Sequence, residues 1–242
     1  MTDEVRSALA PTGTLRAGIN MGNFLLVTGK AGNGDPTGVS PSMAAALASR
    51  LGVPVSYLQY ESPGVLADAA TDDVWDVGNI GAEPARAESI NFTAAYVEIE
   101  ATYLVRGDSP LRTVADVDKA GVRIAVSARS AYDLWLTRTI KHAELVRVAG
   151  LEASFNLFVD EGLDALAGLR PRLVSDVERI PGARIMEERF SAVQQAMGVP
   201  KSRGDAAFQY VRQFVEEAKA SGLVASLIEQ HQVRGLSVAA PA

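Results

Sequence analysis

The chain has 242 residues, of which 48% are hydrophobic and 21% charged, and its formal net charge is −6 at pH 7. This length suits one large or two small domains, and the acidic balance argues against a nucleic-acid partner, because phosphate binding needs a concentrated basic face. Cysteine is absent from the sequence, which excludes disulfides, thiolate metal sites and a cysteine nucleophile.

The first residues, MTDEVRSALAPTG, are acidic and lack the basic start and apolar core of a secretory signal. Elsewhere, no run approaches the ~18 to 20 apolar residues of a membrane span. Localisation therefore stays open at this point. We expect a periplasmic protein if a signal was removed, and a cytoplasmic one if Met1 is the native start.

From Leu15 onward, strand patterns alternate with helix patterns, which is typical of α/β layers. The helix in this first part is marked by Ser40 as its expected N-cap, Pro41 at the first helical position and Gly52 just past its end. The expected strands are 14–19, 53–60 and 75–80, the last closing on a turn at Gly81, and the expected helices are 40–51 and 64–73.

An extended segment at 96–110 is long enough to pass from one lobe to a second. The same alternation of elements then repeats in that second lobe. Its expected strands are 122–127, 143–148, 163–169 and 183–188, and its expected helices are 130–142, 152–162 and 170–180.

A second extended segment at 192–202 is expected to return the chain to the first lobe. Two helices follow, broken at Ser221-Gly222, and the first of them carries an apolar stripe at helical spacing that is typical of a core face. The stripe consists of Phe208, Val211, Phe214 and Val215. The predicted lobes are therefore 1–102 with 196–242, and 103–195.

The two histidines, His142 and His231, lie far apart in the sequence, which argues against a zinc site or a histidine-assisted serine nucleophile. His231, near the end of a polar helix, is interpreted as a charge that complements the helix terminus. We expect no catalytic residue, no metal and no cofactor.

Two lobes joined by two crossing strands enclose a cleft, which is where small ligands bind most often. Arg86 follows the end of a strand of the first lobe, where open α/β sheets place their ligands. From its position alone, Arg86 is either an anion-binding residue or a solvated loop charge.

The sequence resembles the type II solute-binding proteins of ABC importers, in particular the amino-acid-binding branch called family 3. The resemblance rests on TLRAGI, GVSPSMAAALASRLGVPVSY, PARAESINFTAAYVEIEATYLV and QQAMGVPKSRGDAAFQYVRQFVEEAKASGLV, and it extends over about residues 13 to 232. It implies an α/β Venus-flytrap fold of two lobes, with two crossover strands at the hinge and the ligand between the lobes. It also implies a monomer that binds a small anionic or zwitterionic solute and delivers it to the membrane subunit of an ABC transporter.

The resemblance also implies roles for residues. Arg86 matches the arginine that pairs with the ligand carboxylate in a bidentate geometry, and Gly81 ends the strand before it. Arg129, Ser130 and Ala131 match the start of a helix whose free N–H groups bind the same carboxylate. The candidate pocket-wall residues are Asn23, Phe24, Tyr60 and Asn79.

The sequence departs from the family pattern in three respects. The segment from Asp76 to Arg86 is two residues shorter than is common, which brings Glu83 into the turn. Gly168 and Leu169 occupy the region where amino-acid binders carry an acidic partner for the ligand ammonium group, and Arg129-Ser130 replaces a Gly-Thr pair. If Glu83 points inward, it replaces the missing acid and an α-amino acid fits. If Glu83 points to solvent, Arg86 and Arg129 favour a carboxylate or dicarboxylate without an amine.

Two other functions are compatible with the same fold. One is a cytosolic ligand sensor or scavenger, which the N-terminal sequence favours. The other is an enzyme similar to cyclohexadienyl dehydratase, for which Glu83 is the candidate acid, since a carboxyl group does such work when burial raises its pKa.

Overall fold

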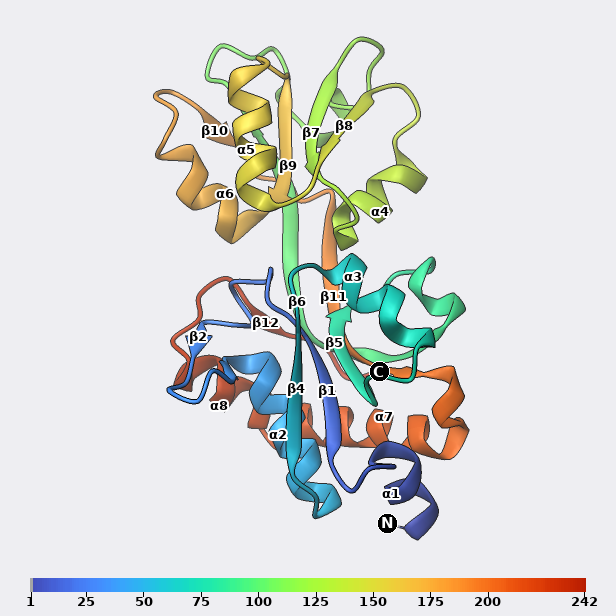
Figure 1. The fold of residues 1–242 in the computed structure, drawn as a ribbon. Helices are drawn as coiled ribbons and strands as arrows, with labels where there is room; N and C mark the ends of the chain where they lie inside the picture. Colours follow the sequence, from blue (N-terminus) through green and yellow to red (C-terminus); the bar gives the residue numbers. More distant parts are fainter. Residues whose placement is uncertain (1) are drawn as a thin grey trace. The chain divides into compact units, whose positions relative to one another are not determined.

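The computed structural model describes residues 2–242 and divides into two compact units. Unit 1 comprises the chain up to Glu98 together with Gln194–Ala242, and unit 2 comprises Ile99–Val193. Both boundaries fall inside strands, β6 (Ile90–Val105) and β11 (Ser191–Pro200), so the chain passes from unit to unit twice in extended conformation (Figure 1). The boundaries lie slightly N-terminal to those expected from the sequence.

Unit 1 is built on a parallel arrangement of three strands, in which the central strand β1 pairs with β4 on one side and β5 on the other. Strand β11 extends this sheet in antiparallel direction beside β5, pairing Gln195 with Gly81 and Gly198 with Gly78. The bounds are β1 (Leu15–Asn20), β4 (Val55–Tyr60) and β5 (Val77–Gly81), with a separate short hairpin of β2 (Gly29–Lys30) and β3 (Pro36–Thr37).

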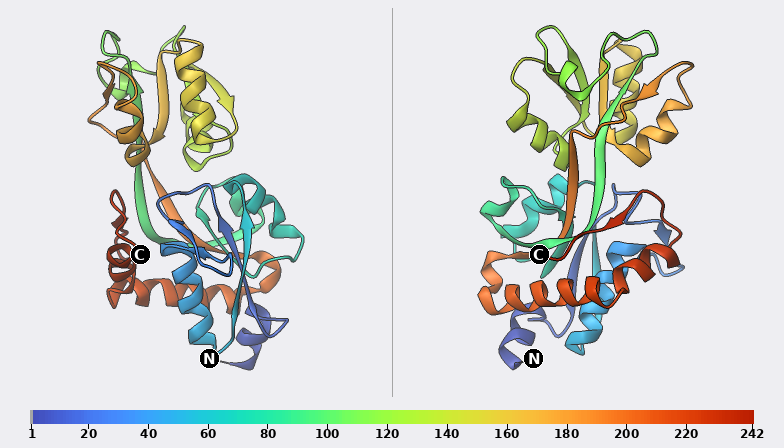
Figure 2. Two further views of the ribbon diagram at one scale, coloured as in Figure 1. Left: turned by 60° about the vertical axis from the view of Figure 1, so that its left-hand side comes forward. Right: turned by 180° about the vertical axis from the view of Figure 1, so that it is seen from behind.

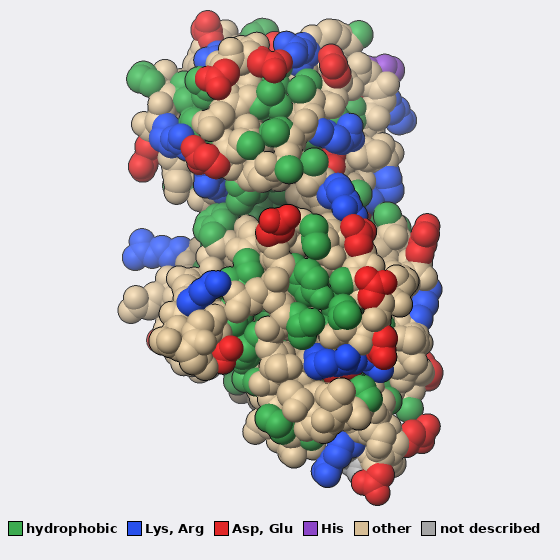
Figure 3. Space-filling model, in the orientation of Figure 1, with side chains coloured by type: hydrophobic (Ala, Val, Ile, Leu, Met, Phe, Trp, Pro, Cys, Tyr) green, Lys and Arg blue, Asp and Glu red, His purple; other side chains and the backbone are tan. Residues whose placement is uncertain are grey.

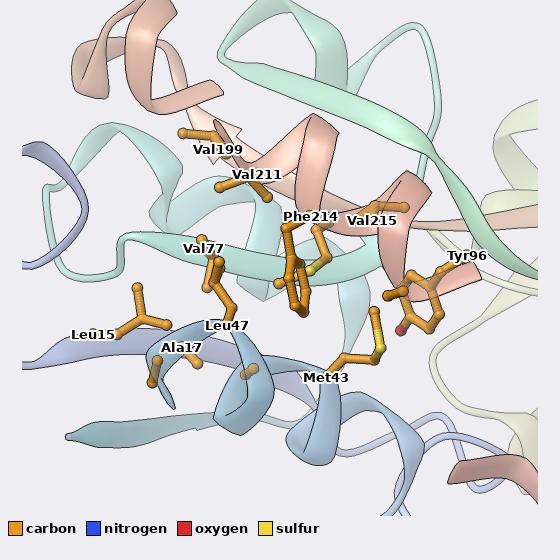
Figure 4. Packing of buried hydrophobic residues seen from close by; sticks show 14 of the residues in the cluster. Leu15, Ala17, Met43, Leu47, Val77, Tyr96, Val199, Val211, Phe214 and Val215 are labelled. Atoms are coloured by element: carbon orange, nitrogen blue, oxygen red, sulfur yellow. The ribbon is translucent and has the colours of Figure 1, made fainter. Parts of the chain in front are cut away.

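Helices cover both faces of this sheet, because alternate residues along the strands face opposite sides. The larger core lies against α2 (Val39–Leu51), α7 (Asp205–Ala220) and α8 (Leu223–Gln230), and contains Val77, Val211 and Phe214 (Figure 4). The smaller core lies on the side of α3 (Pro63–Asp68) and contains Leu66, Trp75 and Ile80.

Glycine at position 78 is required by the smaller core. A Cβ at Gly78 would lie 3.0 Å from side-chain carbons of both Leu66 and Trp75. The Trp75 ring, which is 1% exposed, therefore packs directly on the strand backbone and donates from its Nε1 to the Leu66 carbonyl at 3.2 Å.

Unit 2 has a parallel core of β7 between β8 and β9, extended by β6 beside β9 in antiparallel direction. Its hydrophobic cluster includes Phe155 and Phe158 of α5 and Leu173 of α6. The bounds are β7 (Arg123–Ser127), α4 (Ala131–Thr139), β8 (Glu144–Val148), α5 (Leu151–Asp160), β9 (Ala165–Leu169), α6 (Arg170–Val177) and β10 (Arg184–Ile185), the last pairing with β6.

The order of the major elements agrees with the sequence analysis, and the predicted apolar stripe on α7 lies in the core, with Phe208 only partly buried. The expected N-cap of α2 is wrong: the cap is Gly38, with φ of 141°, and Ser40 lies inside the helix. The elements that were not predicted include α1 (Asp3–Leu9) near the N-terminus, the β2–β3 hairpin and the C-terminal strand β12 (Ser237–Val238). Strand β6 also begins earlier than expected, at Ile90.

Figure 2 shows α7 as one long helix and the C-terminal segment after α8 returning to pair with β6. Within residues 2–242, no helix is both long and apolar enough to cross a membrane. On the face drawn in Figure 3, basic and acidic side chains are interspersed over the surface, consistent with the modest net charge of −6.

Candidate functional site

The candidate site in unit 1 is formed where β5 ends. After Gly81 the chain turns, with the Glu83 carbonyl accepting from the Arg86 backbone N–H at 3.0 Å and from Ala87 N–H at 3.1 Å. The turn continues as a short 3₁₀ helix, η2 (Arg86–Glu88). This geometry brings the Arg86 side chain back to the carboxyl end of the strand that precedes it.

Arg86 is the buried cation of this turn. It is 5% exposed, and its Nη1 donates to the Gly81 carbonyl at 2.7 Å. Since the guanidinium is planar, this bond fixes the orientation of its other donors. A guanidinium held in this way presents a fork that matches a carboxylate or phosphate, which an ammonium group cannot do.

Glu83 is half-buried and belongs to the same turn. Its backbone carbonyl has a structural role, because it accepts the two N–H groups that close the turn. The role of its carboxylate toward a ligand stays a prediction.

The candidate residues of unit 2 lie at the start of α4. Ser130 is the N-cap, and its Oγ accepts from Asp133 N–H at 3.1 Å, while the Asp133 carboxylate accepts from Arg129 N–H at 2.7 Å. Asp133 is 3% exposed and forms an ion pair with Arg147 at 2.9 Å. The helix start that carries Ala131 is therefore held rigidly.

Asp133 is the positioning residue that the sequence analysis missed. The signal was present, because Ser130 followed three residues later by an acidic residue is a helix-start pattern. Arg129 itself is exposed and has a positive φ of 60°, a conformation that costs free energy for any residue except glycine.

The four pocket-wall candidates differ in accessibility. Phe24 is 40% exposed, and Tyr60 is half-buried, with burial raising the pKa of its hydroxyl and Asp72 adding to that rise. Asn23 is buried, and its Oδ1 accepts from Leu25 N–H at 3.2 Å. Asn79 is buried too, and its Nδ2 donates to the Ser40 carbonyl at 2.8 Å. Both asparagines thus have bonds within the fold of unit 1.

Among the described residues, no group of three or more His, Cys, Asp or Glu side chains is arranged to hold a metal ion. His142 is exposed. His231 caps the end of α8 and its Nε2 lies 2.9 Å from Ser42 Oγ of α2, so it joins two helices in addition to lying at a helix terminus.

Residues 22–233 match the family of bacterial extracellular solute-binding proteins, family 3. The chain belongs to this family. The match includes the Arg86 turn, the start of α4 and both strands that pass between the units. No relative was found among curated protein sequences.

Solved structures of similar fold include binding proteins. A mutant of ArgBP from T. maritima has a TM-score of 0.74 at 21% identity, over 95% of this chain and 100% of that one. An amino acid ABC transporter substrate-binding protein from Streptococcus pneumoniae, bound to L-arginine, has a TM-score of 0.73 at 18% identity, over 97% of this chain and 99% of that one.

A third similar structure is an ancestral amino acid-binding protein, a precursor of cyclohexadienyl dehydratase. Its TM-score is 0.73 at 21% identity, over 93% of this chain and 98% of that one. At these identities the likeness establishes the fold, that of the two-lobed type II periplasmic binding proteins, as the sequence predicted.

Proposed function

We propose that this family 3 protein binds a small solute through its carboxylate, an amino acid or a related organic acid, and that Arg86 is the residue that pairs with that carboxylate. The observation that carries the proposal is the 5% exposed guanidinium of Arg86, bonded to the Gly81 carbonyl at the carboxyl end of β5. A guanidinium whose orientation is fixed by a backbone carbonyl, at the end of a parallel strand where open α/β sheets bind ligands, is suited to a planar carboxylate.

The start of α4 supports the same class of ligand. The first N–H groups of a helix lack intrahelical acceptors and favour anions, and Ser130 and Ala131 lie at this position. We propose that these residues contribute N–H donors to carboxylate binding and that Arg129 adds a second cation.

The nature of the second group on the ligand depends on Glu83. At the end of β9, Gly168 and Leu169 carry no carboxylate, and Glu100, the acid that contacts the next residue, is paired with Arg170 at 2.7 Å. If the Glu83 carboxylate reaches the ligand, an α-amino acid is accommodated. If it does not, a carboxylate or dicarboxylate without an amine is favoured.

Binding rather than catalysis is proposed because the similar structures named above are binding proteins, including the precursor of the dehydratase. We further propose a monomer that delivers its solute to the membrane subunit of an ABC-type importer. The sensor or scavenger alternative is separated from this role by a pull-down against candidate transporter subunits with and without ligand.

The test is calorimetric titration of the full chain with a panel of amino acids, monocarboxylates and dicarboxylates. For the ligand that binds, Arg86→Ala is expected to lose at least about 2 kcal/mol of binding free energy, the lower range for truncating one partner of a buried charge pair. Arg86→Lys should recover only part of that loss, because lysine keeps the charge but not the fork.

Arg212→Ala is the matched control, since Arg212 is an exposed arginine of α7 in the same unit. Both variants should keep the circular dichroism spectrum of the parent. Unchanged affinity in Arg86→Ala would remove Arg86 from the site. Turnover of prephenate or arogenate by the parent would instead favour the dehydratase alternative, with Glu83→Gln as the variant to test next.

A further inference from the structure

Three buried oxygen atoms of unit 1 lie beneath the first turn of α2. They belong to Ser40 of α2, Asn79 of β5 and Tyr96 of β6, whose exposed fractions are 2%, 2% and 0%. Within residues 2–242, Ser40 Oγ, Asn79 Oδ1 and the Tyr96 hydroxyl have no hydrogen-bond partner. We refer to these three atoms as the oxygen triad.

Asn79 and Tyr96 each lie near residue 40 of α2. Asn79 Nδ2 donates to the Ser40 carbonyl at 2.8 Å, which places the amide of Asn79 against residue 40. Figure 4 shows Tyr96 with its hydroxyl turned toward Met43 of α2, in the turn after Ser40. Burial raises the pKa of Tyr96, and the Ser40 hydroxyl lies near enough to oppose that rise, although the two hydroxyls do not meet hydrogen-bond geometry.

The surroundings of the triad are apolar, since Met43, Val77 and Val97 belong to the same core. An unpaired polar atom in such a core pays its full desolvation cost, so native structures rarely leave several together. A water molecule that makes two to four hydrogen bonds is the usual solution at a polar site inside a protein. Here it would donate to Asn79 Oδ1 and exchange hydrogen bonds with the hydroxyls of Ser40 and Tyr96.

A metal cation is a poorer occupant than water. All three oxygens are neutral, and hard cations take six or more oxygen ligands, commonly with carboxylates among them. A charge placed in this core without a counter-charge would be costly. The chemistry of the triad therefore selects a neutral molecule with both donors and acceptors.

We propose that Ser40, Asn79 and Tyr96 bind one internal water molecule that joins α2, β5 and β6. Strand β5 ends at Gly81, whose carbonyl holds Arg86, so this water stabilises the strand from which the candidate site is built. The proposal does not depend on which ligand the protein binds.

The test combines a high-resolution crystal structure of the full chain with equilibrium unfolding of Ser40→Ala, Tyr96→Phe and the double variant. Density for a water within hydrogen-bond distance of all three oxygens is expected. Each single variant should lower the folding equilibrium constant about fivefold, the equivalent of roughly 1 kcal/mol, which is a typical net hydrogen bond. The double variant should lose less than the product of the two single losses, because the first substitution already loosens the water.

Tyr57→Phe is the control, since the Tyr57 hydroxyl donates to the Pro41 carbonyl of the same helix at 3.3 Å, outside the triad. Its effect should add to that of Ser40→Ala without coupling. A direct bond between Ser40 and Tyr96 with no water density would overturn the proposal. So would density for a cation with additional oxygen ligands, or a Tyr96→Phe variant as stable as the parent.

Discussion

Arg203 and Asp76 form an ion pair at 2.9 Å in which the two side chains are 10% and 0% exposed. Asp76 also accepts from the backbone N–H of Arg16 at 2.8 Å and pairs with its guanidinium at 2.8 Å. One buried carboxylate thus joins the start of β1, the entry to β5 and the segment that follows β11. Because Arg16, Asp76 and Arg203 are distant in sequence, the contacts of Asp76 hold three separate segments of unit 1 together at one end of the sheet.

Asp76→Asn should therefore destabilise unit 1 strongly. The substitution removes a fully buried carboxylate that pairs with Arg16 and Arg203, both of which keep the exposed Asp73 as a partner. The expected cost is about 1.5 to 3 kcal/mol of unfolding free energy, the range for a hydrogen bond to a charged group. Chemical denaturation followed by circular dichroism measures this loss. Asp72→Asn changes a neighbouring exposed carboxylate and is the control. Equal stability of the two variants would contradict a structural role for Asp76.

Arg129 has φ of 60°, so replacing it tests backbone strain at the start of α4. Arg129→Gly and Arg129→Ala both remove the side chain, but only glycine adopts this conformation without the cost of a Cβ. Arg129→Gly should be more stable than Arg129→Ala by about 1 kcal/mol. Thermal unfolding of the two variants measures the difference. If they unfold alike, the position is not strained, whereas a shared loss of affinity relative to the parent would locate Arg129 in the binding site.

The sequence was sufficient for the order of the elements because apolar periodicity is a local property. The break between α7 and α8 at Ser221-Gly222, for example, follows from residues that are adjacent in the chain. The N-cap of α2 could not be assigned in the same way. Ser40 has the composition of a cap, but Gly38 takes that position because its backbone lies against Leu26, where a Cβ would clash with a carbonyl. That contact is tertiary and leaves no local signal.

For the candidate site, the sequence indicates which residues to consider but not the contacts that they make. The position of Arg86 after a strand could be read from the sequence, but its bond to Gly81 depends on the path of the turn. The partner of Asn79 could not be predicted from the sequence, because a polar residue at the end of a strand can face either a ligand or a helix. Its bond to the Ser40 carbonyl comes from the packing of α2 on the sheet.

Glu152 of α5 gives unit 2 a sensitivity to acid. Hydrogen bonds from Arg179 at 2.7 Å and from Arg172 at 2.5 Å lower its pKa from 4.5 to about 2. A depressed carboxyl pKa contributes stability above the unfolded value, and that contribution is lost as pH falls through the folded value. The stability contributed by Glu152 should thus decrease between pH 4.5 and about 2.

Glu152→Gln should lower the melting temperature at neutral pH and flatten its dependence on pH within that window. Scanning calorimetry over a series of acidic buffers measures both effects. Glu178→Gln, which alters an exposed carboxylate at the end of α6, serves as the control. A parallel pH dependence in parent and Glu152→Gln would show that the two arginines do not act through Glu152.

The C-terminal segment is tied to the strand that leads into unit 2. Strand β12 pairs Ser237 with Glu98 and Val238 with Val97, and Ala239 N–H donates to the Tyr96 carbonyl at 3.1 Å. C-terminal to β12, the Ala240 carbonyl accepts from Lys219 Nζ of α7 at 2.9 Å, which holds the segment against that helix. The pairing with β12 thus reaches Glu98, the last residue of β6 that belongs to unit 1.

Deleting residues 236–242 should expose the β6 backbone at Val97 and Glu98 and destabilise unit 1 by about 1 to 3 kcal/mol, the loss of a few net hydrogen bonds. Hydrogen exchange read by mass spectrometry should show faster exchange in peptides that cover 95–99, while peptides from α5 in unit 2 keep their protection. Deleting only residues 241–242 leaves β12 in place and is the matched control. Unchanged protection of 95–99 in the longer deletion would mean that β12 adds no stability to β6, and faster exchange in both deletions would assign the effect to the final residues instead.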